Sequence, residues 1–146
     1  MVSSQLAESD IPVILEPINN LPTSFDRLGS RLENAALLND AGVKILIAYD
    51  EWETHNAYLS RQGAGIAVSY GLPWYEAINA LTKNVSDTFN IPNRGSLLIG
   101  HHADLIVWDA DPLEVTSFPE QIYISGILMS PNTRSLMLRD RYLNKD

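Results

Sequence analysis

The sequence contains no cysteine, so it can form no disulfide bond and offers no thiolate as nucleophile or metal ligand. It has no apolar run near the roughly 20 residues of a membrane-spanning helix, and its first fifteen residues lack the pattern of a signal peptide. Basic residues are scarce, and the net charge is −8. Nucleic acids and anionic membranes both require a basic face, so we expect neither as a partner. Localisation stays unassigned, with the cytoplasm as the default.

The chain has enough apolar residues for a globular core. Of its 146 residues, 45% are hydrophobic and 19% are charged, a balance typical of folded proteins rather than disordered chains. Up to about Asn93 the order of elements is β-α-β-α-α, and beyond it the chain consists of short strands between glycine and proline turns. The predicted class is therefore α/β, with one region over 1–93 and a small β region over 94–146.

Hydrophobic periodicity predicts the elements of the first region. Continuous apolar runs over 11–17 and 43–50 indicate buried parallel strands, because such strands are covered on both faces. Helical spacing and capping residues predict helices over 3–10, 31–42, 54–70 and 72–84, the third with Thr54 as N-cap. In the second region, strands are expected over 96–99, 103–109, 121–126 and 127–129.

Two adjacent histidines in "GHHAD", His101 and His102, raise the question of a metal site. Neighbouring side chains of a strand point to opposite faces, so the pair cannot chelate one ion there. In a turn they could, but no further histidine or cysteine has suitable spacing. The sequence favours a turn led by Gly100.

The stretch "GSLLIGHHADLIVWDADPLE" (95–114) closely resembles the C-terminal hallmark of the amidohydrolase superfamily, in its imidazolonepropionase-like branch. Upstream, "GLPWYEAINALTKNVSDTFNI" (71–91) and "GVKILIAYD" (42–50) are similar to further stretches of that family, and so is "IPVILEPINNLP" (11–22). Downstream, "YISGILM" (123–129) resembles its closing hairpin and "TRSLMLRDRYL" (133–143) its C-terminal tail. The resemblance thus covers nearly the whole chain.

The resemblance implies a fold and a chemistry. The fold would be a partial (β/α)8 barrel, holding its last two βα units, followed by strands of a small β-sandwich. The reaction would be hydrolysis of a non-peptide C–N bond, in a cyclic amide or an aminoacyl-type substrate, by water activated on a divalent metal, with zinc expected. In an intact site Asp50, at the end of strand 43–50, would ligate the metal and act as general base.

The chain departs from the family in its ligands. It has no His-x-His pair, and Asp50 alone occupies a family ligand position. One carboxylate cannot supply the three or four ligands of a metal site, so we expect the chain alone to bind no metal and to be inactive. The alternatives are a non-catalytic oligomerisation or binding module, or one half of a split hydrolase.

Other polar residues are weaker candidates. His55 and Asn56 follow strand 43–50, where barrel enzymes place substrate-contacting groups, although a lone histidine there is more often a surface residue. Trp52 could line a pocket or serve packing only, with Glu53 beside it in the same loop. Asp109 and Asp111 suggest a carboxylate pair, but Asp-Pro after a strand is ordinary turn chemistry, and we assign both to structure.

The predicted strands also suggest a partner. Strands 11–17 and 43–50 would leave open edges and bare apolar surface where the rest of a barrel would lie. We therefore expect a homo-oligomer formed through these edges, or an interface with the missing N-terminal part.

Overall fold

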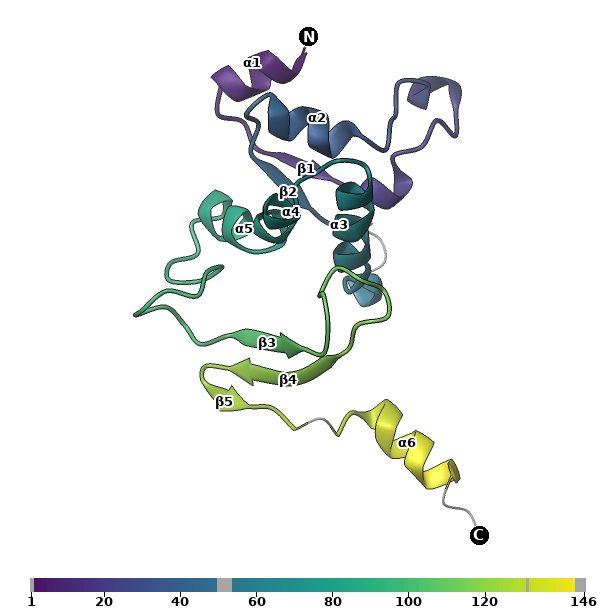
Figure 1. Cartoon of the computed structure of the whole chain (residues 1–146), viewed down its shortest axis with the longest axis vertical. Coiled ribbons are helices and arrows are strands. Elements are labelled where there is room, and N and C mark those ends of the chain that lie inside the picture. Colours follow the sequence, from purple (N-terminus) through teal and green to yellow (C-terminus); the bar gives the residue numbers. More distant parts are fainter. Residues whose placement is uncertain (1, 50–53, 131, 144–146) are drawn as a thin grey trace.

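The computed structural model describes residues 2–49, 54–130 and 132–143 (Figure 1). Its mixed content of helices and strands confirms the predicted α/β class. No helix in these ranges is long and apolar enough to cross a bilayer. The elements in chain order are α1 (Val2–Glu8), β1 (Val13–Leu15), α2 (Asn34–Asp40), β2 (Ile45–Ile47), α3 (Leu59–Ser69), α4 (Trp74–Leu81), α5 (Lys83–Thr88), β3 (Leu105–Trp108), β4 (Pro119–Ile124), β5 (Ile127–Leu128) and α6 (Arg134–Leu143).

A parallel pair of strands lies at the centre of the first region. β1 pairs with β2, with Ile14 opposite Leu46, and α2 connects the two strands. All three residues of β2 are buried, and α2, α3, α4 and α5 contact this strand. The parallel strands predicted over 11–17 and 43–50 are therefore confirmed in type and position, although each is shorter. Burial is confirmed for β2 only, because Val13 and Leu15 of β1 are half-buried and Ile14 is exposed.

The core consists of residues with small or branched side chains from β2, from the helices and from the loops between elements. Its buried members are Ala35, Ala36, Leu38, Val43, Ile45, Ile47, Ala64, Ala67, Leu72, Ala77, Ala80 and Leu113. Half of them are alanines on α2, α3 and α4, so these helices approach one another and β2 closely. Leu113 comes from beyond Asn93, so the β region contributes to the core of the first region.

The edge of β2 that faces away from β1 is partly closed by α5. Adjacent carbonyls of a strand point to opposite edges, and the Lys44 carbonyl accepts from Val13 of β1. The Ile45 carbonyl thus points away from β1, and it accepts a hydrogen bond of 2.9 Å from Asn84 Nδ2. The edge expected to be open is therefore covered in part by a side chain.

The helix predicted over 72–84 is broken into α4 and α5. Thr82 has φ −132° and ψ −85°, and its Oγ1 donates to the Ile78 carbonyl at 2.7 Å. Bonding of a threonine hydroxyl to the preceding turn competes with regular helix geometry. The break turns the chain so that Asn84 reaches β2.

The start of α3 also differs from the prediction. Thr54–Asn56 form one turn of 3-10 helix, and the α-helix begins at Leu59 after Tyr58. Thr54 as N-cap of a helix over 54–70 is therefore wrong. Local capping chemistry does not set this boundary, because the helix has no side-chain hydrogen bond at its cap.

The second region holds a three-stranded antiparallel sheet in the order β3-β4-β5 (Figure 1). Strands predicted over 103–109, 121–126 and 127–129 are confirmed with shifted ends. The strand predicted over 96–99 is wrong, because Gly95 and Gly100 at φ +77° and +90° turn the chain on both sides of it. α6, which sequence patterning did not predict, lies apart from the other elements in Figure 1.

Candidate active site

The carboxyl ends of β1 and β2 lie at the same edge, because the two strands are parallel. β1 ends at Leu15 and continues through Glu16 into a 3-10 turn over Pro17–Asn19. β2 ends at Ile47, three residues before Asp50. Asp50, Trp52 and Glu53 lie outside the described residues.

Helix α3 packs directly on this edge. A Cβ atom added at Gly63 would lie 3.5 Å from Cδ of Pro17 and 3.6 Å from Cγ2 of Ile47. The helix backbone at Gly63 thus lies close to Ile47 at the end of β2 and to Pro17, two residues beyond β1. The segment 54–58 follows β2 in sequence and leads into this helix.

His55 and Asn56 are the two predicted substrate contacts within the described chain. They lie in the 3-10 turn Thr54–Asn56, where His55 is exposed and Asn56 is half-buried. Both are thus carried by the segment that follows β2, as the sequence predicts. Whether either touches a substrate stays a prediction.

Glu16 is a carboxylate that sequence reasoning missed. It directly follows β1, is half-buried, and accepts a hydrogen bond of 2.8 Å from Asn19 Nδ2. Its position at the end of an apolar run could have identified it, because the carboxyl ends of barrel strands carry functional groups.

The described residues do not by themselves fit a metal ion. Across 2–49, 54–130 and 132–143, no three histidine, aspartate or glutamate side chains gather in a way that could hold one. A divalent metal at the β1–β2 edge would therefore need donors beyond these residues. Asp50 is the residue that the family resemblance offers as such a donor.

The "GHHAD" segment forms the predicted turn. His101 Nδ1 lies 3.0 Å from Ser96 Oγ, while the backbone N–H of His102 donates to the Asn93 carbonyl at 2.9 Å. Asp104 accepts a 2.7 Å bond from the Ser125 backbone N–H and pairs with Arg94. The Ser125 bond is the main cause that lowers the pKa of Asp104 below its ordinary value of 3.8; burial opposes the shift, and the charge of Arg94 adds to it. These contacts stabilise the turn.

Asp109 and Asp111 organise the loop over 109–118, which we call the docking loop. Asp109 Oδ1 accepts from the Phe118 backbone N–H at 2.8 Å, and Asp111 Oδ1 accepts from that of Leu113 at 2.9 Å. The carboxylate of Asp111 also accepts from Trp74 Nε1 of α4 at 3.0 Å. Both aspartates thus have turn and docking contacts, in line with their assignment to structure.

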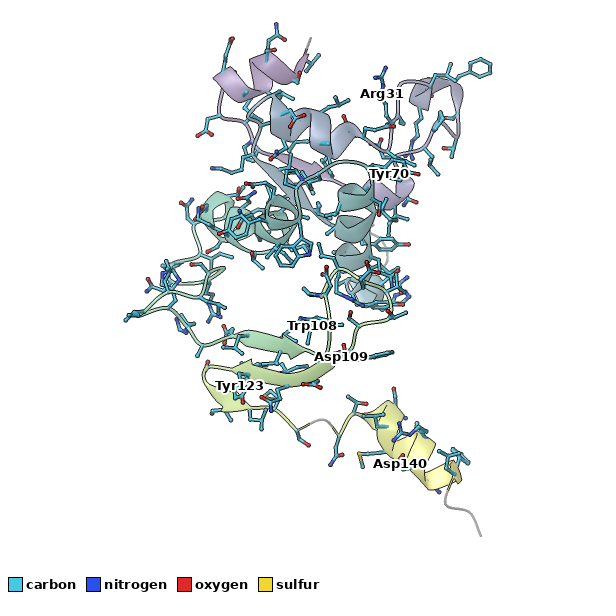
Figure 2. The ribbon with its side chains drawn as sticks, in the orientation of Figure 1. Arg31, Tyr70, Trp108, Asp109, Tyr123 and Asp140 are labelled. Carbon is cyan, nitrogen blue, oxygen red and sulfur yellow. The ribbon has the colours of Figure 1, made fainter. Side chains whose placement is uncertain are left out.

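Arg61 of α3 is a second residue that sequence reasoning missed. Its Nη1 donates to the carbonyls of Pro112 and Glu114, each at 2.6 Å, and its guanidinium carbon lies 4.8 Å from the centre of the Trp108 ring. Figure 2 shows Trp108 and Asp109 at the end of β3, below α3. No local pattern identifies such a contact, because its partners are more than 45 residues away in sequence and two of them are backbone carbonyls.

Comparison with known proteins gives consistent matches. The model of the amidohydrolase family matches residues 1–137. Amidohydrolase tasK of Hapsidospora irregularis is 36% identical over 75 residues, which are 45% of this chain and 8% of that protein. A 5-methylthioadenosine/S-adenosylhomocysteine deaminase of Bacillus cereus strain B4264 is 31% identical over 113 residues, 71% of this chain and 25% of the deaminase.

Solved structures match over most of the chain. An amidohydrolase from Thermotoga maritima MSB8 superposes with a TM-score of 0.78 and 28% identity, covering 90% of this chain and 34% of that protein. A second amidohydrolase structure, 19% identical, gives a TM-score of 0.69 and shows the same fold over 90% of this chain and 37% of its own. The chain thus spans well under half of the length of each of these relatives.

Proposed function

Because the chain belongs to the amidohydrolase family, we propose that it forms the carboxyl-terminal part of a hydrolase that cleaves a non-peptide C–N bond. Residues 1–93 would be the last two βα units of a (β/α)8 barrel, and 94–146 would contribute strands to a β-sandwich. The parallel β1-α2-β2 unit, with its strand ends packed under α3, is the observation that carries the proposal. The Thermotoga maritima relative, with its TM-score of 0.78, supports the same interpretation.

The residues at the β1–β2 edge would have distinct roles. The family is generally metal-dependent, and Asp50 is the residue of this chain that we propose as metal ligand and general base. When bound, a divalent metal such as zinc would lower the pKa of a coordinated water to about 7. His55 and Asn56 would contact substrate from the turn that follows β2. Glu16, across the same edge, would carry negative charge toward the site.

The family resemblance and the relatives support two substrate classes as candidates. A cyclic amide or an aminoacyl-type substrate fits the resemblance of the 95–114 stretch. The deaminase relatives act, by their name, on 5-methylthioadenosine and S-adenosylhomocysteine, so an amino-substituted purine nucleoside is the second class to test.

The experiment uses the longest reading frame that contains residues 1–146, expressed with and without the substitution Asp50→Asn. Hydrolysis is measured on an aminoacyl amide, a cyclic amide and 5-methylthioadenosine in the presence of zinc. Asp50→Asn should lower kcat by about a hundredfold or more, because it removes the proton acceptor. Asp87→Asn, which alters an exposed ion pair with Lys83, is the matched control and should leave kcat unchanged. Equal activity of the two variants would contradict the role of Asp50.

We propose that the 146-residue chain alone is inactive and associates with a partner. Its accessible surface is 10514 Å², whereas the scaling for a compact monomer of 16.2 kDa gives about 7,500 Å². Ile14 of β1 and Ile122 and Ile124 of β4 are among the exposed large apolar residues. A second copy, or the remainder of a longer protein, would cover this surface.

Light scattering on the purified chain tests this expectation. We expect a homo-oligomer at tens of micromolar protein, formed through β1. A compact monomer would contradict it and would favour the binding-module alternative. Activity restored only by adding a separate polypeptide that carries a His-x-His pair would favour the split hydrolase.

A further inference from the structure

The start of α3 lacks local stabilisation. Its N-cap, Tyr58, makes no side-chain cap hydrogen bond, and the first turn holds no acidic residue. Arg61 is the third residue of the helix, where a positive charge opposes the helix dipole. A residue that is unfavourable for its own helix suggests a compensating contact elsewhere.

The docking loop supplies that contact. Arg61 Nη1 donates two hydrogen bonds of 2.6 Å to the carbonyls of Pro112 and Glu114, and the guanidinium lies over Trp108. Hydrogen bonds from a charged donor are about twice as strong as neutral ones. One turn later, a Cβ at Gly65 would lie 2.5 Å from the Leu113 carbonyl, so helix and loop are in close backbone contact.

The docking loop is itself fixed to the first region. Leu113 is 6% exposed and belongs to the core, and Trp74 of α4 donates to the Asp111 carboxylate. The Ser117 hydroxyl donates to the Asp111 carbonyl and closes the loop. Arg61 therefore joins the first turn of α3 to an anchored part of the molecule.

We propose that Arg61 is a positioning residue that holds the segment carrying His55 and Asn56 at the β1–β2 edge. Only Ala57 and Tyr58 separate that segment from α3, so a first turn that frays would release it. The β region would thereby control the geometry of a site to which it contributes no proposed ligand. The functional meaning rests on the proposed function, but the positioning itself does not depend on any activity.

The test uses histidine resonances of the 146-residue chain without substrate. The chain has three histidines, of which His55 reports on the segment while His101 and His102 in the distant turn serve as internal references. The variants are Arg61→Met, which removes the donors, and Arg61→Lys, which keeps a charged donor. Arg139→Met is the matched control, because Arg139 pairs with the exposed Asp140 within α6, away from the docking loop.

Arg61→Met should shift the His55 resonances and leave those of His101 and His102 in place. Amide exchange over residues 60–63 should accelerate by about tenfold or more relative to residues 66–69. Arg61→Lys should show both changes to a smaller extent, because it keeps a charged donor. Arg139→Met should cause neither change. If Arg61→Met does not fold, Trp108→Leu, which removes only the ring contact, should give a smaller shift of the same resonances.

Unshifted His55 resonances in a folded Arg61→Met variant would overturn the proposal. If Arg61→Met does not fold, unshifted His55 resonances in a folded Trp108→Leu variant would overturn it. The positioning role of Arg61 and the proposed hydrolase function can fail separately. If Asp50→Asn leaves hydrolysis intact while Arg61→Met still shifts His55, the proposed function is wrong and the positioning stands.

Discussion

β2 and β4 each contain two isoleucines, but the surroundings of the two strands are very different. All three residues of Ile45–Ile47 are buried, whereas Tyr123 is the one residue of Pro119–Ile124 that is even half-buried. Helices cover β2, but no described element covers the isoleucines of β4 (Figure 1). The first region therefore derives its stability from a buried core, to which Leu113 of the docking loop also belongs. The β region depends on hydrogen bonds, the docking loop and whatever covers its sheet.

The largest expected effect comes from truncating the buried Ile45 of β2, and the exposed Ile122 of β4 is its counterpart in the other region. Ile45→Ala should lower the free energy of unfolding by about 2–5 kcal/mol, because Ile45 is 1% exposed within a packed core. Ile122→Ala, at 38% exposure, should cost less than about 1 kcal/mol. Urea denaturation measures both losses. Equal losses would mean that the sheet is covered in solution.

The contact between the regions can be broken at Gly65. Alanine favours a helix over glycine by about 1 kcal/mol, but a Cβ here would lie 2.5 Å from the Leu113 carbonyl. Gly65→Ala should therefore destabilise the fold by about 1–3 kcal/mol. Gly29→Ala, with nothing within 4 Å of the added Cβ, is the matched control and should be nearly neutral. A stabilised Gly65→Ala variant would argue that the docking loop does not lie on α3.

The turn of the β region should depend on its backbone rather than on its histidines. Gly100 has a φ of +90°, and no atom lies within 4 Å of the place that a Cβ would take, so alanine there meets backbone strain without a steric clash. Gly100→Ala should cost about 1 kcal/mol in thermal unfolding. His102→Ala should have almost no effect, because its contact to Asn93 uses the backbone N–H. Equal losses would assign the histidine a role that these contacts do not explain.

The smallest effect concerns pH and the same turn. The pKa of Asp104 is lowered in the folded state, so its contribution to stability is present above its ordinary value of 3.8 and is lost as the pH falls through the folded pKa. The wild-type chain should be more stable than Asp104→Asn near neutral pH. This advantage should shrink below about pH 4. A difference in unfolding free energy that stays constant with pH would exclude the carboxylate charge as its source.

Sequence reasoning located the features that depend on local chemistry. The apolar runs around Ile14 and Leu46 predicted the parallel strands, and Gly100 predicted the turn, because periodicity and backbone freedom are local properties. The break at Thr82 was missed because periodicity does not reveal that its hydroxyl bonds to the Ile78 carbonyl. The late start of α3 at Leu59 was missed because no capping side chain marks it. The strand expected over 96–99 failed because Gly95 and Gly100 turn the chain on both sides of it, and its residues pair with no strand among the described residues.

The candidate site also combines features that the sequence predicted with features that only the structure revealed. The resemblance pointed to the end of β2, and the structure brings that end together with the end of β1 under Gly63 of α3. Glu16 and Arg61 entered only with the structure, because their importance comes from their three-dimensional surroundings. The roles of Asp50, His55 and Asn56 stay predictions.

The central claim is that this chain provides one donor of a metal site whose other donors lie elsewhere. Elemental analysis of the purified 146-residue chain after incubation with zinc and gel filtration tests it most directly. We predict far less than one zinc per chain, because Asp50 alone cannot supply the three or four ligands that a site requires. Near one zinc per chain, lost in Asp50→Ala and kept in a His101→Ala/His102→Ala double variant, would contradict the claim.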